Sequence, residues 1–166
     1  MFSAGDFLFY PAYGIGKVKG IEEQLDGGAA RAYYILSMLD KKMSVRLPME
    51  NADAVGLRPL IGRQEVEMVF DILQEDPDVS QSQWNKRYQM NNEKLKTGSI
   101  YETAEVVRDL TQRNRKKTLG TKEARMLDTA RQLLISEIAY VLDISEDAAG
   151  ERIVQTLERE VVVAAE

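Results

Sequence analysis

The chain contains neither cysteine nor histidine among its 166 residues. Without cysteine it has no disulfide bond and no thiol nucleophile, and without both residue types it lacks the usual ligands of zinc sites. The absence of histidine also removes the side chain that most often serves as a general acid or base near neutral pH. Several large classes of enzyme and metal site are thereby excluded, and the lack of cysteine suits a reducing cytoplasm.

Long apolar runs are also missing. No window approaches about 18 uninterrupted apolar residues, so the sequence predicts no membrane-spanning helix. The first residues, MFSAGDFLFYP, include an acid and no basic segment before an apolar stretch, unlike a signal peptide. With 44% hydrophobic and 30% charged residues, the composition is that of a globular protein of one or two small domains. We expect a soluble cytoplasmic protein with no membrane partner.

The net charge of −5 is unevenly distributed. Residues 1–60 are balanced, residues 61–83 carry a net charge of −5, and residues 137–166 carry −6. Between the acidic segments, residues 84–117 hold nine basic and four acidic side chains, a net charge of +5. The overall acidity argues against a protein that coats nucleic acid indiscriminately, but the positive block is compatible with a polyanionic partner.

Residues up to about 60 show the pattern of short strands. Apolar, aromatic and β-branched residues gather in runs such as DFLFY and RAYYILSM, and Pro11 and Pro48 end predicted strands. The sequence DGG at 26–28 is a turn signal, because glycine accepts the positive φ that tight hairpins need. Four or five strands at this spacing predict a small β-barrel over residues 1–60.

From about Gly62 the apolar residues recur at helical spacing. The first predicted helix carries four of them on one face, namely Val66, Val69, Phe70 and Leu73. A second helix is predicted to begin near Ser80 or Ser82. A third begins with a capping box, in which Ser99 precedes Glu102 by three residues.

Two further helices complete the pattern. The fourth repeats apolar residues at spacings of three and four (Leu127, Ala130, Leu134 and Ile138), and the fifth begins at Ser145, a favourable capping residue. The predicted fold class is α+β, with a small β-barrel followed over residues 64–166 by an α-helical bundle of about five helices.

No motif for catalysis is present in the sequence. The stretch GIGKVKG resembles a phosphate loop only loosely, because it lacks the GxxxxGK[ST] spacing and a following helix. Most acidic residues lie at helical spacing on polar faces, as expected of a solvated surface. We therefore expect no enzyme, no cofactor and no small-molecule substrate, and a carboxylate- or metal-dependent hydrolase is an alternative without a supporting motif.

Trp84 is the only tryptophan, and it stands among polar residues in SQSQWNKRYQ. It shares a helical stripe with three residues (Tyr88, Asn91 and Leu95), which favours burial of the indole. Its place in the first turn of a helix favours exposure instead, and there the helix dipole attracts phosphate. Lys86 and Arg87 would then hold a nucleic-acid backbone while the indole stacks on a base or inserts at a base step.

A second basic cluster, RNRKK at 113–117, ends the third predicted helix. Basic residues favour the carboxyl end of a helix through its dipole, so a solvated helix end explains the cluster. Contact with phosphate explains it equally well. The spacing alone does not separate the two interpretations.

Four stretches of the sequence resemble the CarD/CdnL family of bacterial RNA-polymerase-binding regulators. They are GDFLFYPAYGIGKV, VRLPMENADAVGLRPL, WNKRYQMNNEKLKTGSIYETAEVVRDL and EARMLDTARQLLISEIA. They follow in order to about residue 142, and the stretch from Trp84 to Leu110 is the most specific. A similar barrel occurs in transcription-repair coupling factors, followed there by a helicase motor that this sequence does not contain.

The resemblance implies a Tudor-like amino-terminal domain that docks on the RNA polymerase β subunit. The segment KMSVRLP would be the exposed edge strand, on which a partner strand can add. It includes Val45, Arg46, Leu47 and Pro48, and Arg46 matches a family arginine that contacts the polymerase. Gln24 stands where family members often have arginine, which would weaken or shift the contact on that side.

The resemblance also implies a helical domain that contacts promoter DNA at the upstream edge of the transcription bubble. Trp84 matches the family tryptophan that inserts in the minor groove, and Asn85, Lys86 and Arg87 accompany it. The predicted function is a transcription regulator that stabilises the open promoter complex and is associated with the nucleoid through RNA polymerase. The alternative is a polymerase-bound adaptor whose helices bind another protein, with Trp84 buried.

Overall fold

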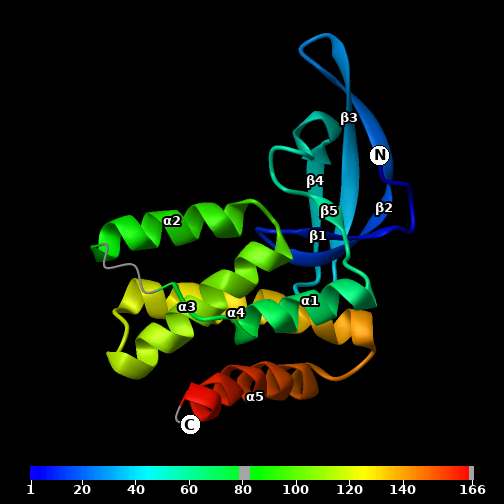
Figure 1. Cartoon of the computed structure of the whole chain (residues 1–166). Coiled ribbons are helices and arrows are strands. Elements are labelled where there is room, and N and C mark those ends of the chain that lie inside the picture. The colour runs from blue at the N-terminus through cyan, green and yellow to red at the C-terminus, as the bar shows by residue number, and fades with distance from the viewer. Residues whose placement is uncertain (79–82, 165–166) are drawn as a thin grey trace. The chain divides into compact units, whose positions relative to one another are not determined.

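The computed structural model describes residues 1–78 and 83–164. The chain divides into two compact units, Met1–Leu60 and Ile61–Glu166, and each has its own apolar core. The first unit is built from strands and the second from helices (Figure 1). The predicted α+β class, a strand unit followed by about five helices, is confirmed.

The amino-terminal unit is a five-stranded antiparallel sheet with the strand order β4-β3-β2-β1-β5. Its elements are β1 (Phe7–Tyr10), β2 (Gly14–Asp26), β3 (Ala29–Met38), β4 (Met43–Pro48), the 3-10 helix η1 (Met49–Asn51) and β5 (Arg58–Pro59). One face of the sheet supplies most of the core: Leu8, Val18, Tyr34, Leu36, Met38 and Leu47. Strand β4, the predicted edge, lies at one end of this order.

Strands β2 and β3 form a long hairpin that ends in the predicted DGG turn. Asp26 pairs with Ala29, and the two glycines between them, Gly27 and Gly28, have φ of 60° and 87°. Positive φ at both central residues gives the turn that matches the right-handed twist of paired strands, which explains the two glycines. The turn end of the hairpin projects from the rest of the unit (Figure 1), and Leu25 is exposed there.

The second unit consists of five helices. They are α1 (Arg63–Gln74), α2 (Trp84–Lys96), α3 (Ile100–Lys116), α4 (Thr121–Leu142) and α5 (Glu146–Ala164). The apolar faces predicted for α1 and α4 are buried in the common core, with Phe70 only partly covered. Burial of these stripes is the main stabilising contribution, since each fully buried Leu, Ile or Val contributes roughly 1.5–3 kcal/mol.

Helix α2 differs from α1, α3 and α4 in how it is attached. Its one fully buried residue is Asn91, and Tyr88 and Leu95 are only partly buried against the core. A buried amide contributes little hydrophobic stabilisation, because removing a polar group from water is itself costly. Helix α2 is therefore held by fewer apolar side chains than its neighbours.

The helix starts agree with the sequence in part. Ser145 caps α5 as predicted, because its Oγ accepts a hydrogen bond from the Ala148 amide at 3.0 Å. Ser99 does precede α3, but the predicted capping box is wrong, since the Glu102 carboxylate instead accepts a hydrogen bond from the Thr97 hydroxyl. The caps predicted for the second helix, Ser80 and Ser82, lie outside the described residues, and α2 begins directly after Gln83.

Candidate nucleic-acid and polymerase interfaces

Trp84 is the first residue of α2, so its indole stands at the amino end of that helix. The residue is 53% exposed, whereas Tyr88, one turn further along, packs against the core. The two rings meet edge to face, with centroids 6.4 Å apart and an interplanar angle of 65°. Of the two interpretations of the stripe, exposure is confirmed, and the burial of Trp84 that the adaptor alternative requires is wrong.

A hollow of about 570 Å³ opens beside Trp84. Three helix ends supply its walls, namely the start of α2, the end of α3 and the start of α4, and all three lie on the same side of the helical unit (Figure 1). Its aromatic and charged lining residues are Trp84, Arg87, Arg113, Lys117, Lys122 and Glu123. The fold thus brings two residues of the RNRKK cluster next to the tryptophan.

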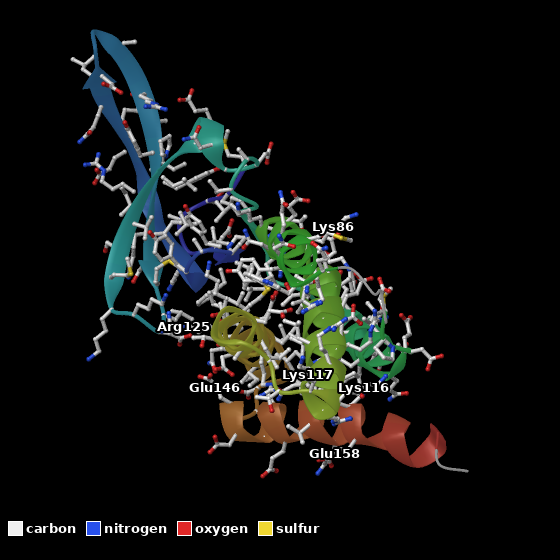
Figure 2. All side chains as sticks on the ribbon, turned by 90° about the vertical axis from the view of Figure 1, so that its left-hand side faces the viewer. Lys86, Lys116, Lys117, Arg125, Glu146 and Glu158 are labelled. Atoms are coloured by element: carbon white, nitrogen blue, oxygen red, sulfur yellow. The ribbon has the colours of Figure 1, made fainter. Side chains whose placement is uncertain are left out.

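The start of α4 makes this hollow favourable for anions. Gly120 is the N-cap of α4 and has no side chain that could accept a hydrogen bond from the first-turn amides. The N–H groups of a first helical turn have no partner within the helix, and they form the positive end of its dipole. The exposed side chains of Lys117 and Lys122 add two positive charges, and Lys117 lies beside Lys116 at the end of α3 (Figure 2).

Arg87 is engaged inside the protein. Its Nε donates to Glu123 Oε2 at 2.8 Å, and its Nη2 donates to Glu123 Oε1 at 2.6 Å. The side chains are only 17% and 6% exposed, and the hydrogen bond with Glu123 raises the pKa of Arg87 above its ordinary value. A phosphate contact by Arg87 stays a prediction. Its partner Glu123 lies 36 residues away, and no sequence pattern indicates this pairing.

The other predicted DNA contacts follow from the geometry of one helical turn. Successive residues of a helix point about 100° apart, so residues i and i+3 share a face. Trp84 and Arg87 accordingly both line the hollow. Asn85 and Lys86 lie between them and are both exposed, and Figure 2 labels Lys86. Asn85 Oδ1 accepts a hydrogen bond from the Lys86 amide at 2.9 Å.

Strand β4 presents alternate residues to opposite faces of the sheet. Leu47 is 5% exposed and Val45 is partly buried, so both side chains belong to the core of the first unit. Arg46 and Pro48 point to the opposite face. Of the four residues predicted along this strand, Val45 and Leu47 therefore have only main-chain groups to offer a partner.

The outward face around Arg46 is an ordered group of charged and aromatic side chains. The guanidinium of Arg46 lies 5.1 Å from the centre of the Tyr33 ring and forms an ion pair with Glu22 at 3.6 Å. Arg31 lies on the other side of this group, with its guanidinium 5.8 Å from the Tyr33 ring. Tyr33 therefore lies within cation–π distance of two arginines.

Arg31 is also the cross-strand partner of Gln24. It pairs with Asp26 at 3.3 Å and with Glu50 of η1, and the hydrogen bond to Glu50 raises its pKa. Gln24 was predicted to weaken the polymerase contact because it replaces an arginine. An arginine, Arg31, nevertheless lies directly opposite it on the neighbouring strand β3. Neither Arg31 nor Tyr33 was predicted as a site residue. The DGG turn fixes the pairing of β2 with β3, so the sequence could have indicated that both residues share a face with Gln24.

Two kinds of feature are absent from the described part of the chain. Residues 1–78 and 83–164 contain no group of three or more acidic side chains placed to hold a metal ion. No helix in these ranges is long and apolar enough to cross a membrane.

Family models match both units of the chain. The model described as the CarD-like/TRCF RID domain matches residues 2–61, and the model of the CarD C-terminal domain matches residues 68–154. The chain belongs to the CarD/CdnL family. The resemblance proposed from its four sequence stretches is thus confirmed, and the sheet unit is Tudor-like, as predicted.

Two similar proteins fall within this relationship. The curated "Putative transcription factor YdeB" of Bacillus subtilis (strain 168) is 35% identical over 146 residues, which span 88% of this chain and 95% of YdeB. Among solved structures, "CdnLNt from Myxoccoccus xanthus" is 36% identical and covers 37% of this chain and 86% of its own, with a TM-score of 0.33.

Membership in the CarD/CdnL family supports a role in transcription regulation and implies an interaction with RNA polymerase. The family is one of transcription factors. The two candidate surfaces lie on different units: the outward face of β2, β3 and β4, and the cationic hollow beside Trp84.

Proposed function

We propose that this CarD/CdnL protein docks on the RNA polymerase β subunit through the edge strand β4 and stabilises the open promoter complex. In this proposal Trp84 enters the minor groove at the upstream edge of the transcription bubble. The observation that carries it is the exposed Trp84 at the mouth of a hollow lined by cations. An exposed indole beside cations is suited to stacking on a base or inserting at a base step while the cations contact the backbone.

A tryptophan wedge acts on open and closed promoter differently. Unstacking a base step costs a few kcal/mol, and less where pairing is already lost. The indole therefore binds better beside an opened bubble than on intact duplex. Only such a difference in affinity can shift the equilibrium between the two promoter states.

The cations beside Trp84 hold the DNA backbone. Lys86, Lys117 and Lys122 are exposed, and each phosphate neutralised steepens the salt dependence of duplex binding by roughly 0.9 log units per log unit of salt. So few contacts give weak binding to DNA alone. Docking on polymerase supplies the missing affinity, because it raises the effective concentration of the helical unit at the promoter.

Docking uses the open edge of the sheet. Strand β4 pairs with β3 on one side and lies at the end of the strand order, so its other side offers main-chain groups for an added strand. Arg46 would fix the register of that strand by reaching an acidic side chain of the β subunit. Gln24, Pro48 and the backbone of Val45 and Leu47 complete the proposed contact.

The test is the lifetime of the open complex on a labelled promoter with the cognate polymerase. Wild type is expected to lengthen the lifetime, while Trp84→Ala and Arg46→Glu lose the effect. Matched controls are Met68→Ala, an exposed apolar residue of α1, and Lys41→Glu, in the turn between β3 and β4. If Trp84→Ala lengthens the lifetime as wild type does, the wedge is refuted.

A further inference from the structure

The amino end of α2, which carries Trp84, is not fixed by apolar packing. Asn91 is the buried residue of this helix, and the partly buried Tyr88 and Leu95 lie further along it. In the first turn the strongest described contact to the rest of the unit is the Arg87–Glu123 pair. Two hydrogen bonds to one carboxylate fix both the distance and the angle between α2 and the start of α4.

The pair has the properties of an internal tether. Glu123 is almost fully buried, and an uncompensated carboxylate in that position is unfavourable. The planar fork of arginine matches the two carboxylate oxygens, which a lysine ammonium cannot do. Trp84 lies three residues before Arg87, on the same side of α2. The Arg87–Glu123 pair fixes the orientation of this first turn, and therefore the direction in which the indole points.

We infer that Arg87 is a positioning residue, held by Glu123, that sets the direction of the Trp84 indole at the mouth of the hollow. The relevance of this direction rests on the proposed function of Trp84. The Glu123 carboxylate occupies the Nε and Nη2 edge of the Arg87 guanidinium, so this edge is already used inside the protein. Within the part of the chain that the structure describes, the exposed cations Lys86, Lys117 and Lys122 have no such internal partner, and they remain the phosphate contacts.

The two roles of Arg87 predict different salt dependences. If Arg87 neutralised a phosphate, its loss would reduce the slope of log affinity against log salt by roughly 0.9. If it positions Trp84, its loss leaves that slope unchanged and alters the environment of the indole in the free protein. Because Trp84 is the only tryptophan, its fluorescence reports on this position alone.

The experiment compares Arg87→Ala, Arg87→Lys, Glu123→Ala and the exchange Arg87→Glu/Glu123→Arg with wild type. Lys94→Ala is the matched control, since Lys94 pairs with Glu105 at 3.0 Å from the opposite end of α2. Lys86→Ala is the control for a phosphate contact. The readouts are anisotropy and acrylamide quenching of Trp84, the salt slope for a forked promoter duplex, and the open-complex lifetime, all well below the unfolding temperature.

The expected result is that Arg87→Ala and Glu123→Ala change the anisotropy and quenching of Trp84 and shorten the open-complex lifetime, with the wild-type salt slope. The exchange Arg87→Glu/Glu123→Arg should recover, at least in part, both the Trp84 signal and the open-complex lifetime. Lys94→Ala should change neither of them. A reduced slope for Arg87→Ala with an unchanged indole signal would overturn the inference. If the alanine variants do not fold, Arg87→Lys and the exchange decide by the same readouts.

The indole signal separates this inference from the proposed function. If Trp84→Ala does not change the open-complex lifetime, the wedge fails, yet the anisotropy of Trp84 in the Arg87 variants still reports whether the tether exists. If the wedge holds and the Arg87 variants leave the indole signal unchanged, the tether alone is refuted.

Discussion

Two arginines at the candidate surfaces are held in opposite ways. Arg46 on the sheet is 44% exposed in its side chain, and its ion pair with Glu22 is a single 3.6 Å contact in solvent. Arg87 on the helical unit is partly buried and forms a bidentate pair with the buried Glu123. The first arrangement leaves a cation free to exchange one partner for another, whereas the second uses a cation to hold the protein's own elements in place.

The largest difference is expected in stability. Arg87→Ala leaves the buried Glu123 without its partner, so it should lower the free energy of unfolding by about 3–5 kcal/mol. Arg46→Ala removes a solvent-exposed pair and should cost less than about 1 kcal/mol. Urea denaturation followed by circular dichroism gives both values. Equal losses of unfolding free energy in Arg87→Ala and Arg46→Ala would contradict the difference proposed between the two arginines.

The order should reverse for polymerase affinity. Arg46→Ala is expected to weaken binding to the polymerase by roughly tenfold or more, equivalent to about 1.4 kcal/mol, as is common for an interfacial arginine. Arg31→Ala should have a smaller effect of the same sign, because it also supports Tyr33. Binding is measured with immobilised polymerase, with Lys41→Ala as control. Wild-type affinity for Arg46→Ala would place the docking surface elsewhere.

A substitution in the β2–β3 turn should lower the stability of the sheet unit alone, by a smaller amount. Gly28→Ala forces an alanine to φ of 87°, which costs roughly 1–2 kcal/mol. Gly20→Ala is the control in the same strand pair, because a Cβ there meets nothing within 4 Å and needs no positive φ. Trp84 fluorescence reports the unfolding of the helical unit, and Gly28→Ala should leave the midpoint of that transition unchanged. A loss at Gly20 equal to that at Gly28 would contradict the turn argument.

The smallest effect concerns the free cations of the hollow. Lys117→Ala and Lys122→Ala should each reduce the salt slope of duplex binding by at most roughly 0.9, with no loss of stability. Lys96→Ala, an exposed lysine at the other end of α2, is the control and should leave the slope unchanged. Slopes identical to wild type for both lining variants would exclude the hollow from the DNA contact.

Local patterns in the sequence predicted the fold well. Val66, Val69 and Leu73 repeat at helical spacing because one face of α1 is buried, and the DGG turn has two glycines because both need positive φ. The capping box at Ser99 was wrong for a reason of the same local kind. A nearby hydroxyl, Thr97, competes for Glu102, and residue spacing does not show which of two polar groups a carboxylate contacts.

The site could be predicted only where its residues are close in the chain. The position of Trp84 in a first helical turn was visible in the sequence, but its neighbours Arg113, Lys117 and Lys122 come from other helices. Their proximity depends on how α2, α3 and α4 pack, which no short-range pattern encodes. The same reason hid the Arg87–Glu123 pair and left the RNRKK cluster with two interpretations.

The open side of β4 has a consequence for the purified protein as well as for docking. An unpaired strand edge is a template for any extended chain, including a second copy of the same strand, and can start aggregation. The charged side chain of Arg46 and the proline at its end, Pro48, are the kinds of residue that make such self-pairing unfavourable. Arg46→Val should therefore leave the fold intact and yet promote self-association, measurable by light scattering at rising concentration.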